Sequence, residues 1–192
     1  EQQILRCATL LPAAGMDVRL FRDALTPELR RLFPGLGRRG WLSAANRLLT
    51  IHPVVRLVCR TELTPTDTDC APFLDSLWTR YALSQYRPDH YVQMAELFTL
   101  AHDRLNSPHC RWLNYSGILL NELDQYQQLH DLYHTRLPAL ETALPPNSTD
   151  LATAYNYYGI ALEKLGHYSD ALAYGQKALS IQQAELPADS VE

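Results

Sequence analysis

The sequence of 192 residues lacks several features that would assign it to a class at once. No apolar run reaches the roughly 18–20 residues that span a bilayer, and no signal peptide opens the chain. Its four cysteines, Cys7, Cys59, Cys70 and Cys110, form no CxxC pair. This spacing predicts small buried hydrophobic residues in a reducing compartment rather than zinc ligands or disulfides. We therefore expect a cytoplasmic protein with no membrane segment.

Catalytic motifs are missing as well. There is no GxxxxGK[ST] phosphate-binding loop, and the YSG at 115–117 is not a nucleophile elbow because an internal repeat explains its glycine. His130 and His134 have the spacing of the two histidines in an HExxH zinc site, but Asp131 replaces the glutamate and no third ligand is evident. Solvated surface histidines are the favoured interpretation. We predict no enzyme, no metal and no cofactor within these residues.

The sequence does contain enough apolar residues for a core, at 46% hydrophobic and 20% charged. Its charge is uneven: residues 1–62 carry ten arginines and five acids, whereas residues 63–192 carry seven bases and sixteen acids. This change of sign predicts two units with different surroundings. The chain begins with Glu1, and we expect it to be part of a longer protein.

An internal repeat occupies the last part of the chain. The segment 112–129 aligns with the start of the segment 154–172 at an offset of 42, and the same offset places the LPP at 144–146 on the LPA at 186–188. The matched pairs are Asn114 and Asn156, Tyr115 and Tyr157, Gly117 and Gly159, Ile118 and Ile160, and Tyr126 and Tyr168. One register that covers both a helix face and a distant loop indicates a true repeat.

Each copy reads as a helical hairpin. In the second copy, Asp150 is predicted to cap a helix over 151–165, and Gly166 supplies a left-handed ending. Gly159 and Ala171 are small because two helices are expected to approach closely there. In the first copy Asp124 replaces the terminal glycine, and aspartate tolerates a positive φ. Since one hairpin cannot bury its apolar faces alone, the copies are expected to stack.

The second copy resembles the tetratricopeptide repeat. The residues at the positions of its pattern are Tyr155, Tyr158, Gly159, Leu162, Gly166, Ala171, Gly175 and Ala178. Three of them depart from the pattern: Tyr158 replaces leucine, Leu162 replaces tyrosine and Gly175 replaces an aromatic residue. The ordinary period is about 34 residues, so the offset of 42 is similar to that of kinesin-light-chain-like and bacterial signalling arrays. The two repeats are placed at about 109–150 and 151–192.

The first sixty residues suggest a winged-helix domain over 1–63. We predict helices over about 2–11 and 16–25, a third helix broken at Pro34-Gly35, a β-hairpin within 41–52, and a helix that begins at Pro53. In this last helix the side chains predicted to face inward are Val54, Leu57 and Val58. A further helix pair, at 70–83 and 90–105, is interpreted as a divergent cap spanning 64–108. The predicted fold is thus mainly α: a small winged-helix domain with a β-hairpin, followed by an α-helical tetratricopeptide-type solenoid.

The phrases LLPAAGMDVRLFRDAL, GWL and IHPVVRLVCR also resemble the winged-helix segment of STAND-class signalling ATPases of the NB-ARC type. The resemblance implies that a nucleotide-binding core precedes these residues and that ATP or ADP binds there. In that family a Met-His-Asp motif contacts the β-phosphate of ADP, and Ile51-His52-Pro53 occupies its place with only the histidine retained. His52 is therefore a candidate nucleotide sensor in the intact protein; the alternative is a histidine that merely ends a strand.

Winged helices also bind DNA, and Arg30, Arg31, Arg38 and Arg39 lie around the third predicted helix. The break at Pro34-Gly35 and the small size of the domain argue against nucleic acid. The excess of arginine is equally consistent with a contact to a nucleotide or to an acidic neighbouring domain.

In stacked hairpins of this kind the first helix of each pair lines the hollow side. Predicted groove residues that would bind a protein or peptide are Arg111, Asn114, Tyr115, Ile118, Asn121 and Glu122 in the first copy, and Thr153, Asn156, Tyr157, Ile160, Glu163 and Lys164 in the second. The alternative is that these polar residues only solvate a surface.

Three functions remain open from the sequence. The first is a protein-interaction and regulatory segment of a STAND-type signalling ATPase, in which the repeats sense a partner and the winged helix relays occupancy to the nucleotide-binding core. The second is a winged-helix DNA-binding regulator with a repeat sensor, and the third is a scaffold without switching.

Overall fold

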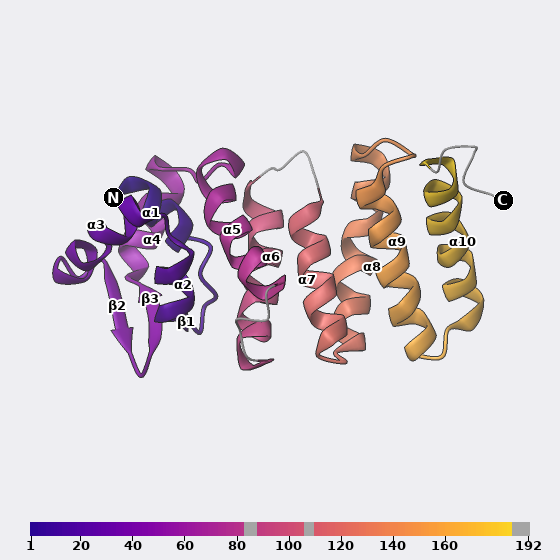
Figure 1. Ribbon diagram of the computed structural model, residues 1–192, viewed down its shortest axis with the longest axis horizontal. Helices are drawn as coiled ribbons and strands as arrows, with labels where there is room; N and C mark the ends of the chain where they lie inside the picture. Colours follow the sequence, from indigo (N-terminus) through magenta and orange to yellow (C-terminus); the bar gives the residue numbers. More distant parts are fainter. Residues whose placement is uncertain (83–87, 106–109, 186–192) are drawn as a thin grey trace. The chain divides into compact units, whose positions relative to one another are not determined.

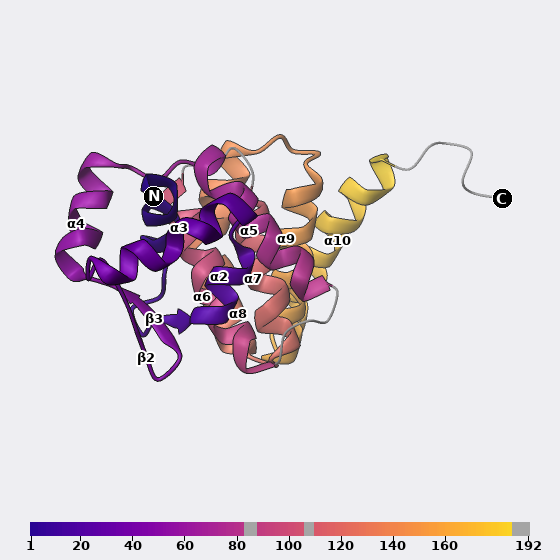
Figure 2. The ribbon, with the colours of Figure 1, turned by 60° about the vertical axis from the view of Figure 1, so that its left-hand side comes forward.

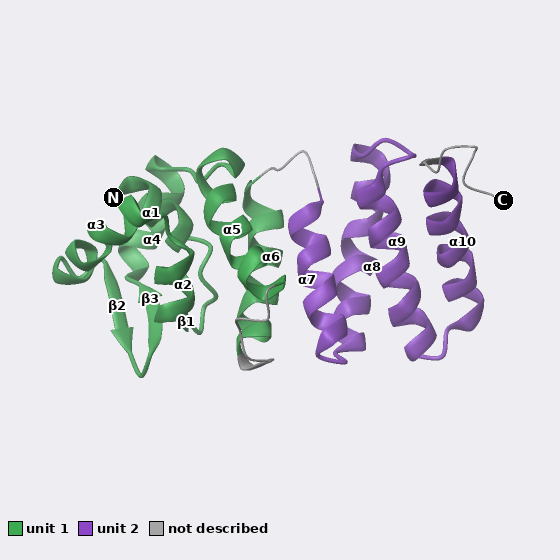
Figure 3. Ribbon diagram, in the orientation of Figure 1, with its two compact units in different colours: residues 1–107 green, residues 108–192 purple. Residues whose placement is uncertain are grey.

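The computed structural model describes residues 1–82, 88–105 and 110–185. Within these residues the chain forms ten helices and one small antiparallel sheet of three strands, which confirms the mainly helical prediction (Figure 1). It divides into two compact units, Glu1–Ser107 (unit 1) and Pro108–Glu192 (unit 2) (Figure 3). No described helix combines the length and apolar character needed to cross a bilayer.

Unit 1 contains six helices and the sheet among its described residues. The helices are α1 (Gln2–Ala8), α2 (Val18–Ala24), α3 (Pro27–Arg38), α4 (Pro53–Glu62), α5 (Asp67–Ala82) and α6 (Pro88–Leu105). The strands are β1 (Met16–Asp17), β2 (Leu42–Ala45) and β3 (Leu48–Ile51).

The sheet has the order β1-β3-β2, with Met16 opposite Leu49 and Leu42 opposite Ile51. Asn46 and Arg47 join β2 to β3 with φ values of 51° and 66°. Two consecutive positive φ values give the turn whose twist matches antiparallel strands. The hairpin predicted within 41–52 is confirmed.

The predicted break in the third helix is wrong. α3 runs without interruption through Pro34, capped by the Thr26 hydroxyl, which accepts from the Leu29 amide. A proline removes only one backbone donor, and the buried Leu36 beyond it anchors the following turn.

The core of unit 1 joins residues distant in sequence. The ring of Phe21 in α2 lies 4.9 Å from that of Phe73 in α5, and the sulfurs of Cys7 and Cys70 lie 3.9 Å apart. Arg6 donates to the Leu63 carbonyl at 2.9 Å and pairs with Asp69 at 3.2 Å. The segment interpreted as a separate cap therefore contributes α5 to the same core as α1 and α2.

Unit 2 contains two helical hairpins. They are α7 (Arg111–Glu122) with α8 (Tyr126–Ala143), and α9 (Thr149–Lys164) with α10 (Tyr168–Glu185). The end of α7, the start of α8 and the end of α8 each recur 42 residues later in α9 and α10. The internal repeat read from the sequence is thus a repeat of structure.

The turns within the hairpins match the predicted chemistry. Asp124 and Gly166, which follow α7 and α9, have φ values of 55° and 87°. The predicted cap is wrong, however: Ser148, not Asp150, is the N-cap of α9, and its hydroxyl accepts from the Leu151 amide at 3.4 Å. Asp150 lies in the first turn, where its charge favours the helix dipole.

Candidate interaction surfaces

The residues predicted to line one groove do not form one site. Asn114 is 4% exposed, so its predicted place in a ligand groove is wrong. Its amide nitrogen donates to the Asp150 carbonyl at 2.9 Å, and its oxygen accepts from the Tyr133 hydroxyl at 3.1 Å. Through these two hydrogen bonds Asn114 joins α7 to both α8 and α9. The bonds satisfy its side-chain amide, since a buried polar group must be hydrogen-bonded.

Most of the other predicted groove residues contact their own helix or its neighbour. The Arg111 guanidinium lies 4.0 Å from the centre of the Trp112 ring, and Tyr115 packs edge-on against Trp112. The Thr153 hydroxyl donates to the Thr149 carbonyl at 2.9 Å. Ile118 and Asn121 are half-buried, and Glu122 is exposed.

Tyr157 and Lys164 lie nearer to the first hairpin. Burial, with a smaller contribution from Glu122, raises the pKa of Tyr157. The Lys164 ammonium lies 6.0 Å from the centre of the Tyr126 ring. Both residues therefore lie close to the first hairpin, and Lys164 remains exposed.

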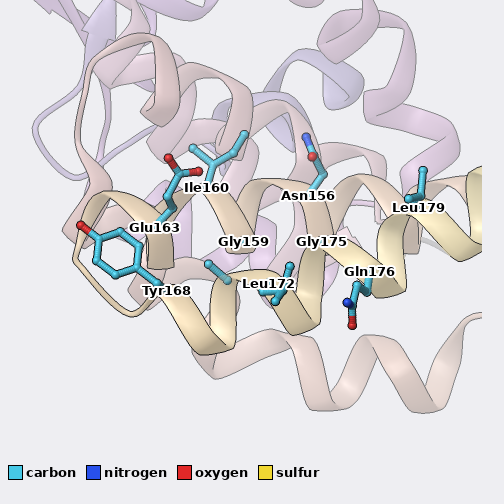
Figure 4. Close-up of a pocket in the computed structure, with 10 residues that line it drawn as sticks. Asn156, Gly159, Ile160, Glu163, Tyr168, Leu172, Gly175, Gln176 and Leu179 are labelled. Carbon is cyan, nitrogen blue, oxygen red and sulfur yellow. The ribbon is translucent and has the colours of Figure 1, made fainter.

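Asn156, Ile160 and Glu163 do share an open cleft. It lies between α9 and α10 with a volume of about 440 Å³ (Figure 4). The lining residues are Asn156, Gly159, Ile160, Glu163, Tyr168, Ala171, Leu172, Gly175, Gln176 and Leu179. Figure 4 shows that α9 supplies one side of the cleft and α10 the other.

The α10 side of this cleft is apolar and exposed. Tyr168, Leu172 and Leu179 are 70%, 65% and 52% accessible. None of the three was predicted from the sequence, because ligand contacts were expected only on the first helix of each pair. A signal was present: Leu172 and Leu179 lie seven residues apart, on a different face of α10 from the buried Ala178.

A second cluster, formed by His130, His134 and Tyr158, joins α8 to α9. The two imidazole rings are stacked 5.1 Å apart, and His134 Nδ1 lies 3.0 Å from the Tyr158 hydroxyl. His130 Nδ1 lies 2.9 Å from Asp131, and this hydrogen bond lowers the pKa of Asp131. Across the described parts of the chain, no three His, Cys, Asp or Glu side chains gather as a metal site would require.

Next to this cluster, Glu141 links both hairpins of unit 2. Its carboxylate accepts from the Tyr155 hydroxyl at 2.8 Å and from the Lys177 ammonium at 3.1 Å. Burial opposes its ionisation, but the two hydrogen bonds outweigh it and lower the pKa of Glu141. These contacts stabilise the pairing of α8 with α9 and α10.

His52 lies at the boundary that the sequence indicated. It is exposed, its amide donates to the Trp41 carbonyl at 3.0 Å, and its side chain makes no capping bond to α4. Pro53 is the first residue of α4, as predicted. The imidazole is therefore available for a contact outside unit 1.

The predicted orientation of α4 is wrong. Val54, Leu57 and Val58 are 61%, 64% and 47% exposed rather than buried. The inward face carries Cys59 and Arg56, whose guanidinium donates to the Leu11 carbonyl at 3.1 Å. Figure 2 shows α4 at the edge of unit 1, where β3 leads into it.

Comparison with known proteins gives no assignment. No protein-family model matches the chain, and neither curated proteins nor solved structures show a significant similarity to it.

Proposed function

We propose that the chain is a protein-interaction and regulatory segment of a STAND-type signalling ATPase. In this proposal residues 1–63 of unit 1 are a winged-helix relay, unit 2 is a tetratricopeptide-type array that senses a protein or peptide, and neither performs catalysis. The observation that carries the proposal is the exposed apolar face of α4 directly after His52.

An apolar face of this kind marks an interface. Val54 and Leu57 lie on α4 within five residues of His52, so whatever covers them also comes close to the imidazole. The resemblance implies that the covering partner is the nucleotide-binding core of the same protein. The residues present fit a single contact to a phosphate, since His52 is exposed, but they contain no phosphate-binding loop of their own.

Partner capture in unit 2 is assigned to those predicted groove residues that are not fully buried. Asn114 leaves this set because its hydrogen bonds are internal. The remaining residues are Arg111, Tyr115, Ile118, Asn121, Glu122, Thr153, Asn156, Tyr157, Ile160, Glu163 and Lys164.

The test is ADP retention by the intact protein that contains the nucleotide-binding core. We expect His52→Ala to speed ADP release by removing the phosphate contact, and Leu57→Asp to do the same by charging the covered face. His167→Ala, an exposed histidine in the α9–α10 turn, is the matched control. Release rates for both variants equal to that of the control would refute the proposal, as would an intact protein that binds no nucleotide.

The DNA-binding alternative has one observation in its favour. α3 is continuous, and Arg31, Arg38 and Arg47 are exposed on α3 and at the tip of the β2–β3 hairpin. Phosphate contacts give binding that weakens steeply with salt. A gel shift with duplex DNA at two salt concentrations distinguishes the candidates: salt-sensitive binding that Arg31→Ala and Arg38→Ala abolish favours this alternative.

A further inference from the structure

The cleft between α9 and α10 repeats a surface that is already covered in the first hairpin. Asn114, His130 and His134 all contact α9: Asn114 bonds to the Asp150 carbonyl at 2.9 Å, His130 packs 5.5 Å from the Tyr158 ring, and His134 lies 3.0 Å from its hydroxyl. Their counterparts 42 residues later are Asn156, Leu172 and Gln176. All three line the open cleft (Figure 4).

The two surfaces differ in solvent exposure. Leu137 of α8 is 2% exposed and Asn114 is 4% exposed, whereas their counterparts Leu179 and Asn156 are exposed, Leu179 at 52%. The first hairpin is covered by α9, which packs on both α7 and α8. Nothing within the described residues covers the second hairpin in the same way. The apolar side chains of the cleft therefore correspond to the surface that the first hairpin packs against α9. In the second hairpin no described helix packs on this surface.

The sequence beyond α10 repeats the sequence that leads into α9. Pro187, Ser190 and Glu192 match Pro145, Ser148 and Asp150 at the offset of 42. Ser148 is the N-cap of α9, and Asp150 supplies the carbonyl that Asn114 binds. This register favours a helix of the same polypeptide over a helix of another protein.

We propose that the α9–α10 cleft receives the first helix of a further 42-residue repeat, packed as α9 packs on α7 and α8. Asn156 then donates to a carbonyl in the first turn of that helix, as Asn114 does to Asp150. Asn114 and Asn156 then recur in the sequence because they connect successive hairpins, and in this packing Asn156 leaves the partner-binding set proposed above for unit 2. This inference does not depend on the proposed signalling function.

The residues that line the cleft also predict which side chains the incoming helix has at its contact positions. Leu172 replaces His130, which packs on the Tyr158 ring, and Gln176 replaces His134, which bonds to its hydroxyl. The position that Tyr158 holds in α9 is therefore expected to carry a large aromatic or apolar side chain that packs on Leu172, and a tyrosine there can bond to Gln176 through its hydroxyl. A Cβ at Gly175 would meet nothing within 4 Å, so the incoming helix has room for a larger side chain there.

The test appends a second copy of residues 151–192 directly after Glu192, which continues the register. We expect the amide hydrogens of α10 to exchange at least tenfold more slowly than in the 192-residue chain, and the midpoint of thermal unfolding to rise in one cooperative transition. Asn156→Ala is expected to reverse part of this protection in the extended chain while leaving α10 exchange in the 192-residue chain unchanged. Leu172→Glu with Leu179→Glu is expected to abolish it.

The matched control is Ala173→Glu with Ser180→Glu, two exposed positions of α10 that do not line the cleft. This control should retain the protection. Unchanged exchange in the extended chain would overturn the proposal, and so would an appended copy that adds no helical circular dichroism, because a matching face is expected to order at least its first helix. A dimer of the 192-residue chain that Leu172→Glu dissociates would assign the cleft to a second copy instead.

Discussion

Gly117 and Gly159 occupy the same place in the two hairpins of unit 2 but have different neighbours. A Cβ at Gly117 would lie 2.9 Å from Cε2 of Tyr133, whereas one at Gly159 would lie 3.4 Å from the Ala171 carbonyl oxygen. Tyr133 of α8 corresponds to Gly175 of α10 at the offset of 42. Both glycines therefore permit close contact with the second helix of their pair, through a ring in one case and backbone in the other.

Gly117→Ala is expected to destabilise the protein by about 1–3 kcal/mol, because its methyl group overlaps the buried Tyr133 ring. Urea unfolding measures the difference. The matched variant Gly159→Ala should change the free energy of unfolding by less than about 1 kcal/mol, since its methyl group meets ordinary contacts and alanine favours the helix. Equal losses for the two variants would contradict this assignment of neighbours.

Cys110 gives a prediction for alkaline pH. Burial raises the pKa of this thiol from 9.0 to about 12. The folded state therefore holds a proton that the unfolded state releases, so this contribution is complete below pH 9 and is lost as pH rises towards 12. Between pH 8 and pH 10 the free energy of unfolding should fall by about 1.4 kcal/mol more for the natural protein than for Cys110→Ala. Parallel urea unfolding curves at the two pH values would contradict it.

At the scale of elements, hydrogen bonds between helices determine which of the repeated residues contribute to stability. Asn114 is buried between α7, α8 and α9, while Asn156 faces the open cleft. Loss of a buried hydrogen-bonded amide leaves its partners unsatisfied, which costs about 1–3 kcal/mol. A surface substitution stays within about 0.5 kcal/mol.

Asn114→Ala is thus expected to lower the free energy of unfolding by about 1–3 kcal/mol, and Asn156→Ala by less than about 0.5 kcal/mol, in the 192-residue chain. Chemical denaturation of both variants checks the difference. If Asn156→Ala proves as costly as Asn114→Ala, the two amides are equivalent inside one hairpin and the role in connecting hairpins is refuted.

The start of α9 offers a second test at this scale. Ser148→Ala removes the cap and should destabilise the protein by about 1 kcal/mol. Asp150→Asn keeps the shape of the side chain and loses only its interaction with the helix dipole, about 0.3–1 kcal/mol that falls with added salt. A larger loss in the free energy of unfolding for Asp150→Asn that does not change with salt would instead support Asp150 as the N-cap, as the sequence predicted.

For the whole molecule, each unit has one helix that exposes several large apolar side chains. Unit 1 exposes Val54, Leu57 and Val58 on α4, and unit 2 exposes Leu172 and Leu179 on α10. Neither face contributes to the core of its own unit, so each is expected to be used in contacts with something else.

This distribution predicts an uneven cost of substitution. Leu57→Asp and Leu172→Asp should each change the free energy of unfolding by less than about 0.5 kcal/mol. Leu36→Ala, at a fully buried position, should cost about 2–5 kcal/mol. Thermal and urea unfolding of the three variants tests the prediction, and a large loss at Leu57 would show that α4 has its apolar face inward.

The sequence by itself determined the elements that depend on local chemistry. Glycine and aspartate at positive φ, proline at the first position of α4, and the 42-residue register predicted the turns, the hairpin and both helix pairs of unit 2. These features follow from backbone sterics and side-chain period, which act within a few residues. The candidate sites were less predictable, since Asn114 and Asn156 are identical in sequence and differ only in what covers them.

Tertiary structure alone decided which face of each helix is buried. The spacing of Val54, Leu57 and Val58 is that of a core face, yet α4 packs through Cys59 and Arg56 because α1 and the loop at Leu11 provide partners there. Likewise Asn114 is enclosed only because α9 lies across it. Whether a side chain is buried depends on segments that are distant in the sequence. The helical pattern of one segment contains no information about those segments.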